Sequence, residues 1–189
     1  ALPHLAIDPV VIASQIILSL QTIISRYLNP VDNALITVTK IHGGSAYNVI
    51  DDEVILNGTV RTFKQEIRDK IEKRINEIAK GIAKANGGEA EVVYFRKYPP
   101  TINSKKESIF SSIVAKELVG EKNVQMDVEP SMGGEDFSYL LNEKPGSYLY
   151  IGQRDSNHKD YLHTTKYDFN DDLLPIGVNF WVNLVKYFF

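Results

Sequence analysis

KQEIRDKIEKRINEIAKGIAKAN, residues 64–86, is the stretch that decides the architecture of the first half of the chain. Isoleucines recur along it every three or four residues, with Lys, Arg and Glu between them: Ile67, Ile71, Ile75, Ile78 and Ile82. This period predicts an amphipathic helix with one apolar stripe, closed by Gly87-Gly88. The stripe could face a sheet or a partner subunit, and a helix of this kind usually buries it against its own sheet.

The sequence around this helix predicts further elements. They are a helix over Pro9–Leu28 and strands at Leu35–Ile41, Val54–Phe63 and Ala90–Tyr98. Asp8 is a favourable helix cap with proline directly after it. Leu35–Ile41 alternates as a strand, and Val54–Phe63 and Ala90–Tyr98 also read as strands. With a first strand expected before Ala1, the order is that of a ferredoxin-like βαββαβ unit.

After Pro100 the pattern changes to one that resembles α/β layering. We predict helices at Glu107–Leu118, Phe137–Asn142 and Leu173–Phe188, and short strands at Val124–Val128 and Ser147–Ile151. So few strands do not easily close a sheet of their own. The chain is therefore expected to form two domains, at residues 1–99 and 100–189.

The bulk composition excludes several classes of protein. The 189 residues are 43% hydrophobic and 24% charged, as in globular proteins, and the net charge of −3 argues against nucleic-acid binding. No cysteine is present, so any metal must be held by histidine and carboxylate. The apolar N-terminal run lacks a basic region and a cleavage site and is too interrupted to span a membrane. We therefore expect a cytoplasmic protein without a membrane partner.

Two neighbouring motifs bring together the residues that could carry chemistry. PSMGGEDF at 130–137 combines a glycine pair with two carboxylates, and YLHTT at 161–165 contains His163. Glycine lets the backbone approach another group closely. Glu135 and Asp136 could serve catalysis or could simply cap the following helix, because acids suit a first turn. His163 by itself is more often a structural histidine than a metal ligand.

Arg61 and Asn48 are candidates for substrate binding. Arg61 lies on a predicted strand of apolar and Thr residues, where a lone arginine is usually a solvated edge residue. Its alternative role is to anchor a carboxylate with the guanidinium fork. Asn48 lies in the glycine-containing loop HGGSAYNVIDD, either as a turn residue or as a polar contact to a ligand.

Five stretches taken together resemble a known family. In order they are PHLAIDPV (3–10), HGGSAYNVIDDEVILNGTVRTF (42–63), YPPTIN (98–103), GGEDFSYLL (133–141) and LHTTKYDFND (162–171). The series closely resembles the zinc-dependent aminoacylase, hippurate hydrolase and carboxypeptidase family of amidohydrolases, which includes plant auxin-conjugate hydrolases. The resemblance covers essentially the whole chain.

The resemblance implies a fold, a cofactor and a partner. Residues 1–99 would be a ferredoxin-like lid, and residues 100–189 the C-terminal portion of an α/β zinc-hydrolase catalytic domain. Two zinc ions, or cobalt or manganese, are expected in each full-length subunit. The substrate would be an N-acyl amino acid or a peptide with a free carboxylate. A homodimer through the lid is expected, with a higher oligomer as the alternative.

The resemblance also assigns residues. His163 falls on the last metal-ligand histidine of the family, and Arg61 on the lid arginine that holds the substrate carboxylate. Asn48 falls on a lid asparagine that approaches the reaction centre, often that of the partner subunit. Gly134 belongs to a loop at the active-site floor.

The family's other metal ligands and its general-base glutamate are expected upstream of Ala1, so no catalytic residue is expected within this chain. His4 falls on a histidine of structural role, and Asp51 replaces a usual proline. The main hypothesis is the lid and C-terminal segment of a larger hydrolase. The rival is a non-catalytic dimerisation or interaction module built on the ferredoxin-like unit.

Overall fold

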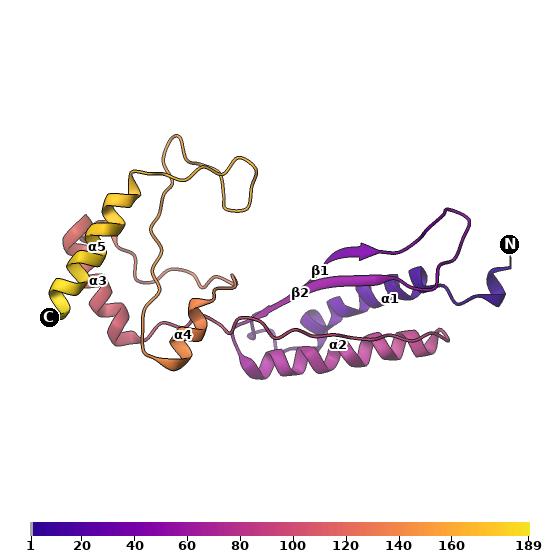
Figure 1. Ribbon diagram of the computed structural model, residues 1–189. Helices are drawn as coiled ribbons and strands as arrows, with labels where there is room; N and C mark the ends of the chain where they lie inside the picture. The colour runs from indigo at the N-terminus through magenta and orange to yellow at the C-terminus, as the bar shows by residue number, and fades with distance from the viewer. Residues whose placement is uncertain (1) are drawn as a thin grey trace. The chain divides into compact units, whose positions relative to one another are not determined.

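The structure is a computed structural model that describes residues 2–189. The chain divides into two compact units. Unit 1 contains the residues up to Pro100 together with Met132–Gly134, and unit 2 contains Thr101–Ser131 and Glu135–Phe189. Figure 1 shows the order of the elements along the chain. The roles of lid and catalytic segment predicted for the two halves remain predictions.

Two helices supply most of the core of unit 1. A short 3₁₀ turn at Pro3–Leu5 precedes α1 (Pro9–Thr22), which continues into a π-helical turn, η2, at Ile23–Tyr27. The Asp8 carboxylate accepts the backbone N–H groups of Val10 at 2.9 Å and Val11 at 3.3 Å. The predicted cap is therefore confirmed, because this carboxylate satisfies N–H groups that have no partner in a first helical turn.

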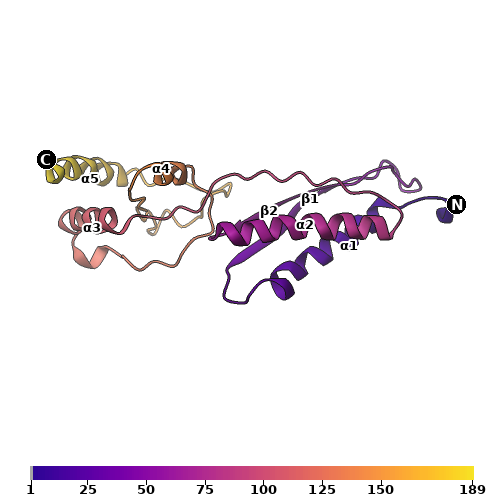
Figure 2. The same ribbon diagram turned by 90° about the horizontal axis from the view of Figure 1, so that it is seen from below.

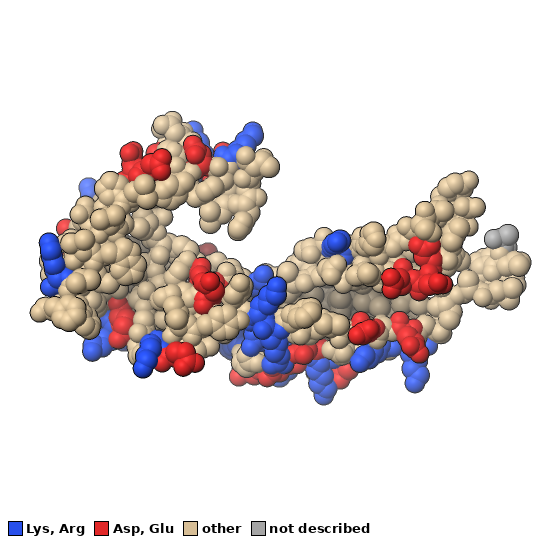
Figure 3. Space-filling view, viewed as in Figure 1, with Lys and Arg blue, Asp and Glu red and all other residues tan. Residues whose placement is uncertain are grey.

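Helix α2 (Gln65–Ala85) forms where the isoleucine period predicts it. Ile67 and Ile71 are fully buried in the core of unit 1 itself, so the stripe faces its own unit rather than a partner. Gly87 ends the helix with φ of 78°, and the Gly88 N–H donates to the Ala83 carbonyl at 2.9 Å, as in a Schellman motif. Figure 3 shows charged side chains of both signs along its outer face.

Strands β1 (Ala34–His42) and β2 (Ile55–Thr62) form an antiparallel hairpin, in accord with the two predicted strands. Ala34 pairs with Thr62 at one end and His42 with Ile55 at the other, and a β-bulge interrupts the register between Val38 and Lys40. Figures 1 and 2 show α1 and α2 running beneath this hairpin. The core consists of Ile12, Ile16, Leu20, Ile23, Leu28, Ile36, Ile67, Ile71, Ile78, Ala79 and Ala83.

The stretch Pro9–Tyr27 is apolar and long enough to cross a membrane by composition alone, with a mean hydropathy of 1.4. Its inward side chains, however, belong to the core described above. Burial in the unit accounts for part of the apolar character of this helix, whereas Val10, Val11 and Leu18 are exposed.

Residues 90–98 differ from the prediction, because they run extended without a sheet partner. Exposure alternates along them as in a strand: Ala90 and Val92 pack on the core, while Val93 (63%) and Phe95 (76%) are exposed. In a split βαβ pattern the last strand pairs with the first, which is expected before Ala1 and so falls outside the described residues. The prediction of a paired strand is wrong here, since no segment of residues 2–189 lies beside it as a strand.

Side chains tie this extended segment to α2 instead. The Arg96 guanidinium pairs with Asp69 at 2.6 Å and also contacts Glu72, and Arg68 Nη1 donates to the Lys97 carbonyl at 3.4 Å. Arg68 Nε is buried and has no hydrogen-bond partner within the described part of the chain. The segment is thus fixed through charged groups rather than through main-chain pairing.

Unit 2 is helical within its described residues. Its elements are α3 (Lys105–Val119), the turn η3 (Glu121–Asn123), α4 (Phe137–Glu143) and α5 (Leu173–Phe188), which confirms the three predicted helices. Helices α3 and α5 lie side by side (Figures 1 and 2). Phe110 of α3 meets Phe188 of α5 edge to face at 6.3 Å.

The strands predicted at 124–128 and 147–151 are not formed, because unit 2 offers them no strand to pair with in its described residues. The second stretch is held by a side chain instead. Asn103 Nδ2 donates to the Tyr148 carbonyl at 2.9 Å, and the Tyr148 N–H donates to Asn103 Oδ1 at 2.8 Å. An asparagine amide thus stands in for one residue of a neighbouring strand.

Candidate functional site

His163 lies on an exposed loop of unit 2, between Gly152 and α5. Its backbone is left-handed, with φ of 66°, a conformation that few residues other than glycine adopt. A turn surrounds it, since Thr164 Oγ1 donates to the Tyr161 carbonyl at 2.9 Å and the Tyr167 N–H donates to the Thr164 carbonyl at 3.2 Å. Backbone strain of this kind in an exposed loop is typical of functional sites.

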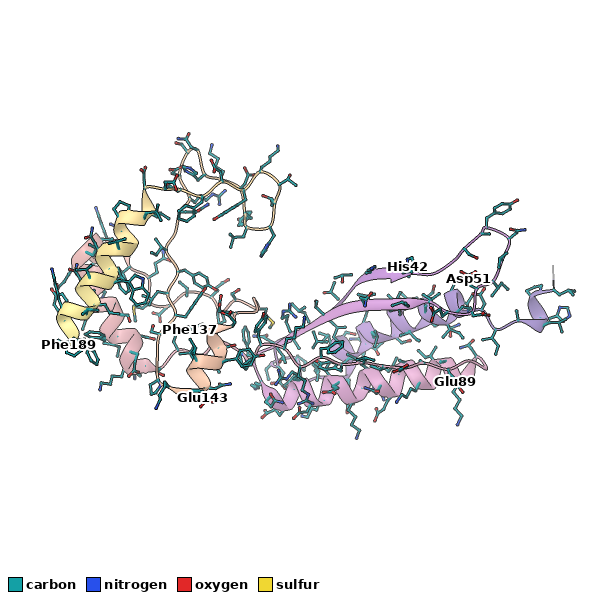
Figure 4. The ribbon with its side chains drawn as sticks, viewed as in Figure 1. His42, Asp51, Glu89, Phe137, Glu143 and Phe189 are labelled. Atoms are coloured by element: carbon teal, nitrogen blue, oxygen red, sulfur yellow. The ribbon has the colours of Figure 1, made fainter. Side chains whose placement is uncertain are left out.

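Glu135 caps the start of α4, as one of the two sequence interpretations proposed. Its Oε1 accepts the Phe137 N–H at 3.4 Å, and its Oε2 accepts the Tyr148 hydroxyl at 2.8 Å. The hydrogen bond from the Tyr148 hydroxyl, and then the one from the Phe137 N–H, lower the pKa of Glu135. The hydrogen bond to Glu135, and then burial, raise the pKa of Tyr148 to about 12. Figure 4 labels both ends of this helix. At neutral pH Glu135 is therefore a carboxylate with its acceptor positions engaged.

Arg61 lies on β2 opposite Leu35 and is half-buried. Its Nη1 donates to the neighbouring Val60 carbonyl at 3.0 Å, and it forms no ion pair with Asp or Glu within residues 2–189. Tyr94 lies near it: burial raises the pKa of Tyr94, and the positive charges of Arg68 and Arg61 oppose that rise. A positively charged, half-buried position without an acidic partner suits an incoming anion.

Asn48 lies in the loop that joins β1 to β2, at the other end of β2 from Arg61. The six residue-to-residue steps from Ile55 to Arg61 along the strand separate the two by roughly 20 Å. One small substrate bound to one chain therefore cannot touch both. The structure does not bring these two predicted site residues together.

The loop that carries Asn48 surrounds a hollow of about 250 Å³, lined by His42, Gly43, Gly44, Ser45, Asp51, Glu53 and Ile55. Ser45 Oγ donates to Asp51 Oδ1 at 2.5 Å. Asp51, which replaces the usual proline, thus ties the two sides of the loop together. His42 and Asp51 are labelled in Figure 4.

Gly134 belongs to unit 1 and lies against the ring of Tyr98. A Cβ atom at this position would stand 3.1 Å from Tyr98 Cδ2, which is tighter than ordinary van der Waals contact. A larger residue here would require the Tyr98 ring to shift by a few tenths of an ångström. This is the close approach that the glycine pair predicted, and the partner is a side chain of the protein.

The residues of this chain do not make up a metal centre by themselves. Within residues 2–189, no group of three or more His, Asp or Glu side chains is placed to hold a metal ion. A catalytic zinc site needs three protein ligands. His163 can supply one imidazole, which is fewer than the three protein ligands of such a site.

Sequence reasoning missed two arrangements in unit 2. It did not connect Glu135 with Tyr148, which lie thirteen residues apart and meet through a hydroxyl. It also assigned no role to Asn170, a buried polar residue at 7% exposure. No spacing rule signals either contact, since both depend on how loops fold back.

Comparison with known structures places the chain in a class of hydrolases. It superimposes on a dinuclear metal-binding peptidase of Bacillus subtilis, the YXEP protein, with a TM-score of 0.69 and 28% identity over 94% of this chain and 45% of that one. The model of peptidase family M20/M25/M40 matches residues 6–187, and the chain belongs to this family. The resemblance predicted from the motif series is thereby confirmed, as are the mixed α/β fold class and the expectation of an enzyme family.

Relatives of known function are hydrolases. The chain is 40% identical to N-acetyl-L-cysteine deacetylase of Bacillus subtilis over 86% of this chain and 38% of the relative. It is 36% identical to hippurate hydrolase of Campylobacter jejuni over 98% of this chain and 48% of the relative. The chain thus spans less than half the length of the proteins it matches.

Proposed function

We propose that the chain is the lid and the C-terminal catalytic segment of a metal-dependent amidohydrolase. Its substrates are N-acyl amino acids or peptides with a free carboxylate. Residues 1–99 serve as the lid and residues 100–189 as part of the catalytic domain. Family membership over residues 6–187 supports this, and both relatives are named for substrates that are N-acyl amino acids.

The surroundings of Arg61 are the observation that supports a substrate with a free carboxylate. The residue is half-buried, its Nη1 donates only to the Val60 carbonyl, and it has no acidic partner within the described residues. A carboxylate bound in two-point fashion would give this guanidinium an acidic partner. Arg68, which lies near the same Tyr94 ring, adds positive potential and has its own unsatisfied Nε.

Within this proposal, His163 contributes one imidazole to a divalent metal centre. The remaining ligands and the general-base glutamate come from sequence upstream of Ala1. Zinc is the expected metal, with cobalt or manganese as alternatives. When bound, such a metal makes water a nucleophile near neutral pH. Glu135 acts as a fixed carboxylate that shapes the floor of the site, and not as a proton donor.

Asn48 serves the reaction centre of a partner subunit in a homodimer formed through the lid. The separation of roughly 20 Å along β2 supports this, because it keeps Asn48 away from a substrate held by Arg61 of the same chain. A cytoplasmic location follows from the soluble class of enzyme that is proposed.

Helix α5 supports the proposal that unit 2 is part of a larger domain. None of its residues is buried, and its exposed side chains include Val178, Trp181 and Val185. An isolated unit rarely leaves such a patch uncovered. Further sheet or helix packed on this face would bury it.

A chimera tests the proposal. The N-terminal part of the Campylobacter hippurate hydrolase, which this chain does not match, is fused before residue 2, loaded with zinc and assayed for hydrolysis of N-acyl amino acids. We expect turnover that His163→Ala abolishes, whereas Lys159→Ala, a change at an exposed residue of the same loop, leaves it intact. A folded, zinc-loaded chimera that hydrolyses none of these substrates would refute the proposal.

A further inference from the structure

A polar cluster formed by Gln153, Asp155 and Asn170 closes the base of the loop that carries His163. The Gln153 side chain has all its hydrogen-bonding groups directed at the far side of the loop. Its Nε2 donates to the Asp168 carbonyl at 3.1 Å, and its Oε1 accepts the Tyr167 hydroxyl at 3.1 Å and the Asn170 N–H at 3.4 Å. The Gln153 amide thus joins the first residues of the loop to its last residues.

Asn170 completes the connection from the other side. Its Nδ2 donates to the Gln153 carbonyl at 3.3 Å and to Asp155 Oδ2 at 3.2 Å. Asn170 is 7% exposed, so these bonds are made where water competes little. Buried amides of this kind are costly unless fully paired, and fully paired they favour one conformation.

Asp155 links the cluster to the first turn of the loop. Its Oδ1 accepts the N–H of Asn157 at 2.7 Å and the N–H of His158 at 2.8 Å, and contacts His158 Nδ1 at 3.0 Å. Asp155 therefore binds the first turn through Oδ1 and the Asn170 side chain through Oδ2. The loop between these anchors has no comparable buried contact of its own, since its residues from 159 to 166 are exposed.

We propose that Gln153, Asp155 and Asn170 are positioning residues that hold the 156–169 loop closed, so that the left-handed backbone of His163 presents its imidazole in one orientation. The role for which His163 is presented, metal binding, rests on the function proposed above. The cluster acts through the loop and touches neither the imidazole nor a substrate.

The strained backbone of His163 depends on the loop being held at both ends. A histidine at φ of 66° in an open, exposed loop would relax to an ordinary conformation unless the ends of the loop were fixed. Fixing the ends removes part of the conformational freedom of the residues between them. The described contacts supply that fixation at both ends of the loop.

Capping of α5 is the competing role for Asn170, because its Oδ1 accepts the Asp172 N–H at 3.1 Å. Asn170→Asp separates the two roles. The carboxylate retains an oxygen for the Asp172 N–H, but it loses the amide donor and repels Asp155. Asn157→Asp is the matched control, because it makes the same chemical change at an exposed position of the same loop.

The experiment is ¹⁵N relaxation on the 189-residue chain and its variants. We expect Asn170→Asp to lower the order parameters of residues 160–166 from about 0.8 to below about 0.6, with α5 signals unchanged. Asn157→Asp should leave them high. Asp155→Asn added to Asn170→Asp should restore them in part, because the donor and acceptor of the bond between these two side chains are then exchanged, whereas the Gln153 carbonyl still lacks the donor that Asn170 Nδ2 gave it. Unchanged order parameters in Asn170→Asp would overturn the proposal, and Gln153→Ala provides a second, independent break.

Zinc titration followed by the His163 ring signals separates this inference from the proposed function. With the loop loosened in Asn170→Asp, we expect the apparent affinity of His163 for zinc to fall by about two- to fivefold, in proportion to the competent population. Loss of loop order with unchanged zinc affinity overturns the positioning role. Absence of any zinc response in the unaltered chain and in the chimera counts against the proposed function alone.

Discussion

Replacing Ile71 of α2 by alanine tests whether the isoleucine stripe belongs to the core of unit 1 or to a subunit interface. Ile71 is 0% exposed and belongs to a core shared by α1, α2 and β1. The rival interpretation of the chain as an interaction module would use the same stripe for a partner. The two interpretations predict different consequences for the same substitution.

The magnitude follows from the atoms removed. Ile71→Ala deletes three buried carbons at about 0.8 kcal/mol each, or about 2.4 kcal/mol of transfer free energy. The cavity that remains moves the cost into the range of about 2–5 kcal/mol for such changes, and the better helix propensity of alanine returns a few tenths. We therefore expect unit 1 to lose about 2–4 kcal/mol of unfolding free energy.

The assay is urea unfolding followed by the amide signals of α2. With a slope near 1 kcal/mol per molar urea for a unit of this size, the midpoint should fall by about 2–4 M, equally at low and high protein concentration. Ile41→Ala is the control, because Ile41 is 61% exposed and should cost less than about 1 kcal/mol. An unchanged midpoint together with concentration-dependent dissociation would refute the assignment to the core.

Three further predictions concern ionisation and substrate binding. Glu135→Gln should lower the pKa of Tyr148 from about 12 toward its ordinary value near 10, as read from the ¹³C shift of its ring; a pKa that stays at 12 contradicts the pairing. The Asp155 carboxyl should titrate at about 2, mainly because the His158 N–H donates to it. Since that pKa lies below its unfolded value, the stabilisation is complete above about pH 4 and is lost as pH falls toward 2; a carboxyl signal that titrates near 4 is the contrary result. In the zinc-loaded chimera, Arg61→Ala should raise KM for N-acyl amino acids by about tenfold or more with kcat less affected, and equal kinetics with Arg61 intact or removed would exclude the anchor.

Sequence patterns predicted the features that depend on contacts between residues close together in the sequence. The Asp8 cap and α2 both follow from short-range patterns, and both form as expected. Val54–Phe63 has the residue types of a strand and becomes β2 because β1 lies beside it. Ala90–Tyr98 is also rich in β-branched and aromatic residues but stays unpaired, because local composition describes one strand and says nothing of its neighbour.

The residues of the candidate site were predicted from the sequence, but their geometry was not. His163 and Arg61 were chosen from motif order, which does not report the left-handed backbone of the first or the missing acid partner of the second. The bonds from Asn170 to Gln153 and Asp155 span 15–17 positions. Contacts of that range arise only when a loop closes, so no helical or strand period indicates them.

Calorimetric zinc titration tests the central claim most directly, which is that this chain supplies one ligand, His163, to a metal centre completed elsewhere. The account predicts at most weak binding by the 189-residue chain, tight binding by the chimera, and loss of a tight site from the chimera with His163→Ala. Tight zinc binding by the 189-residue chain that survives His163→Ala would contradict it.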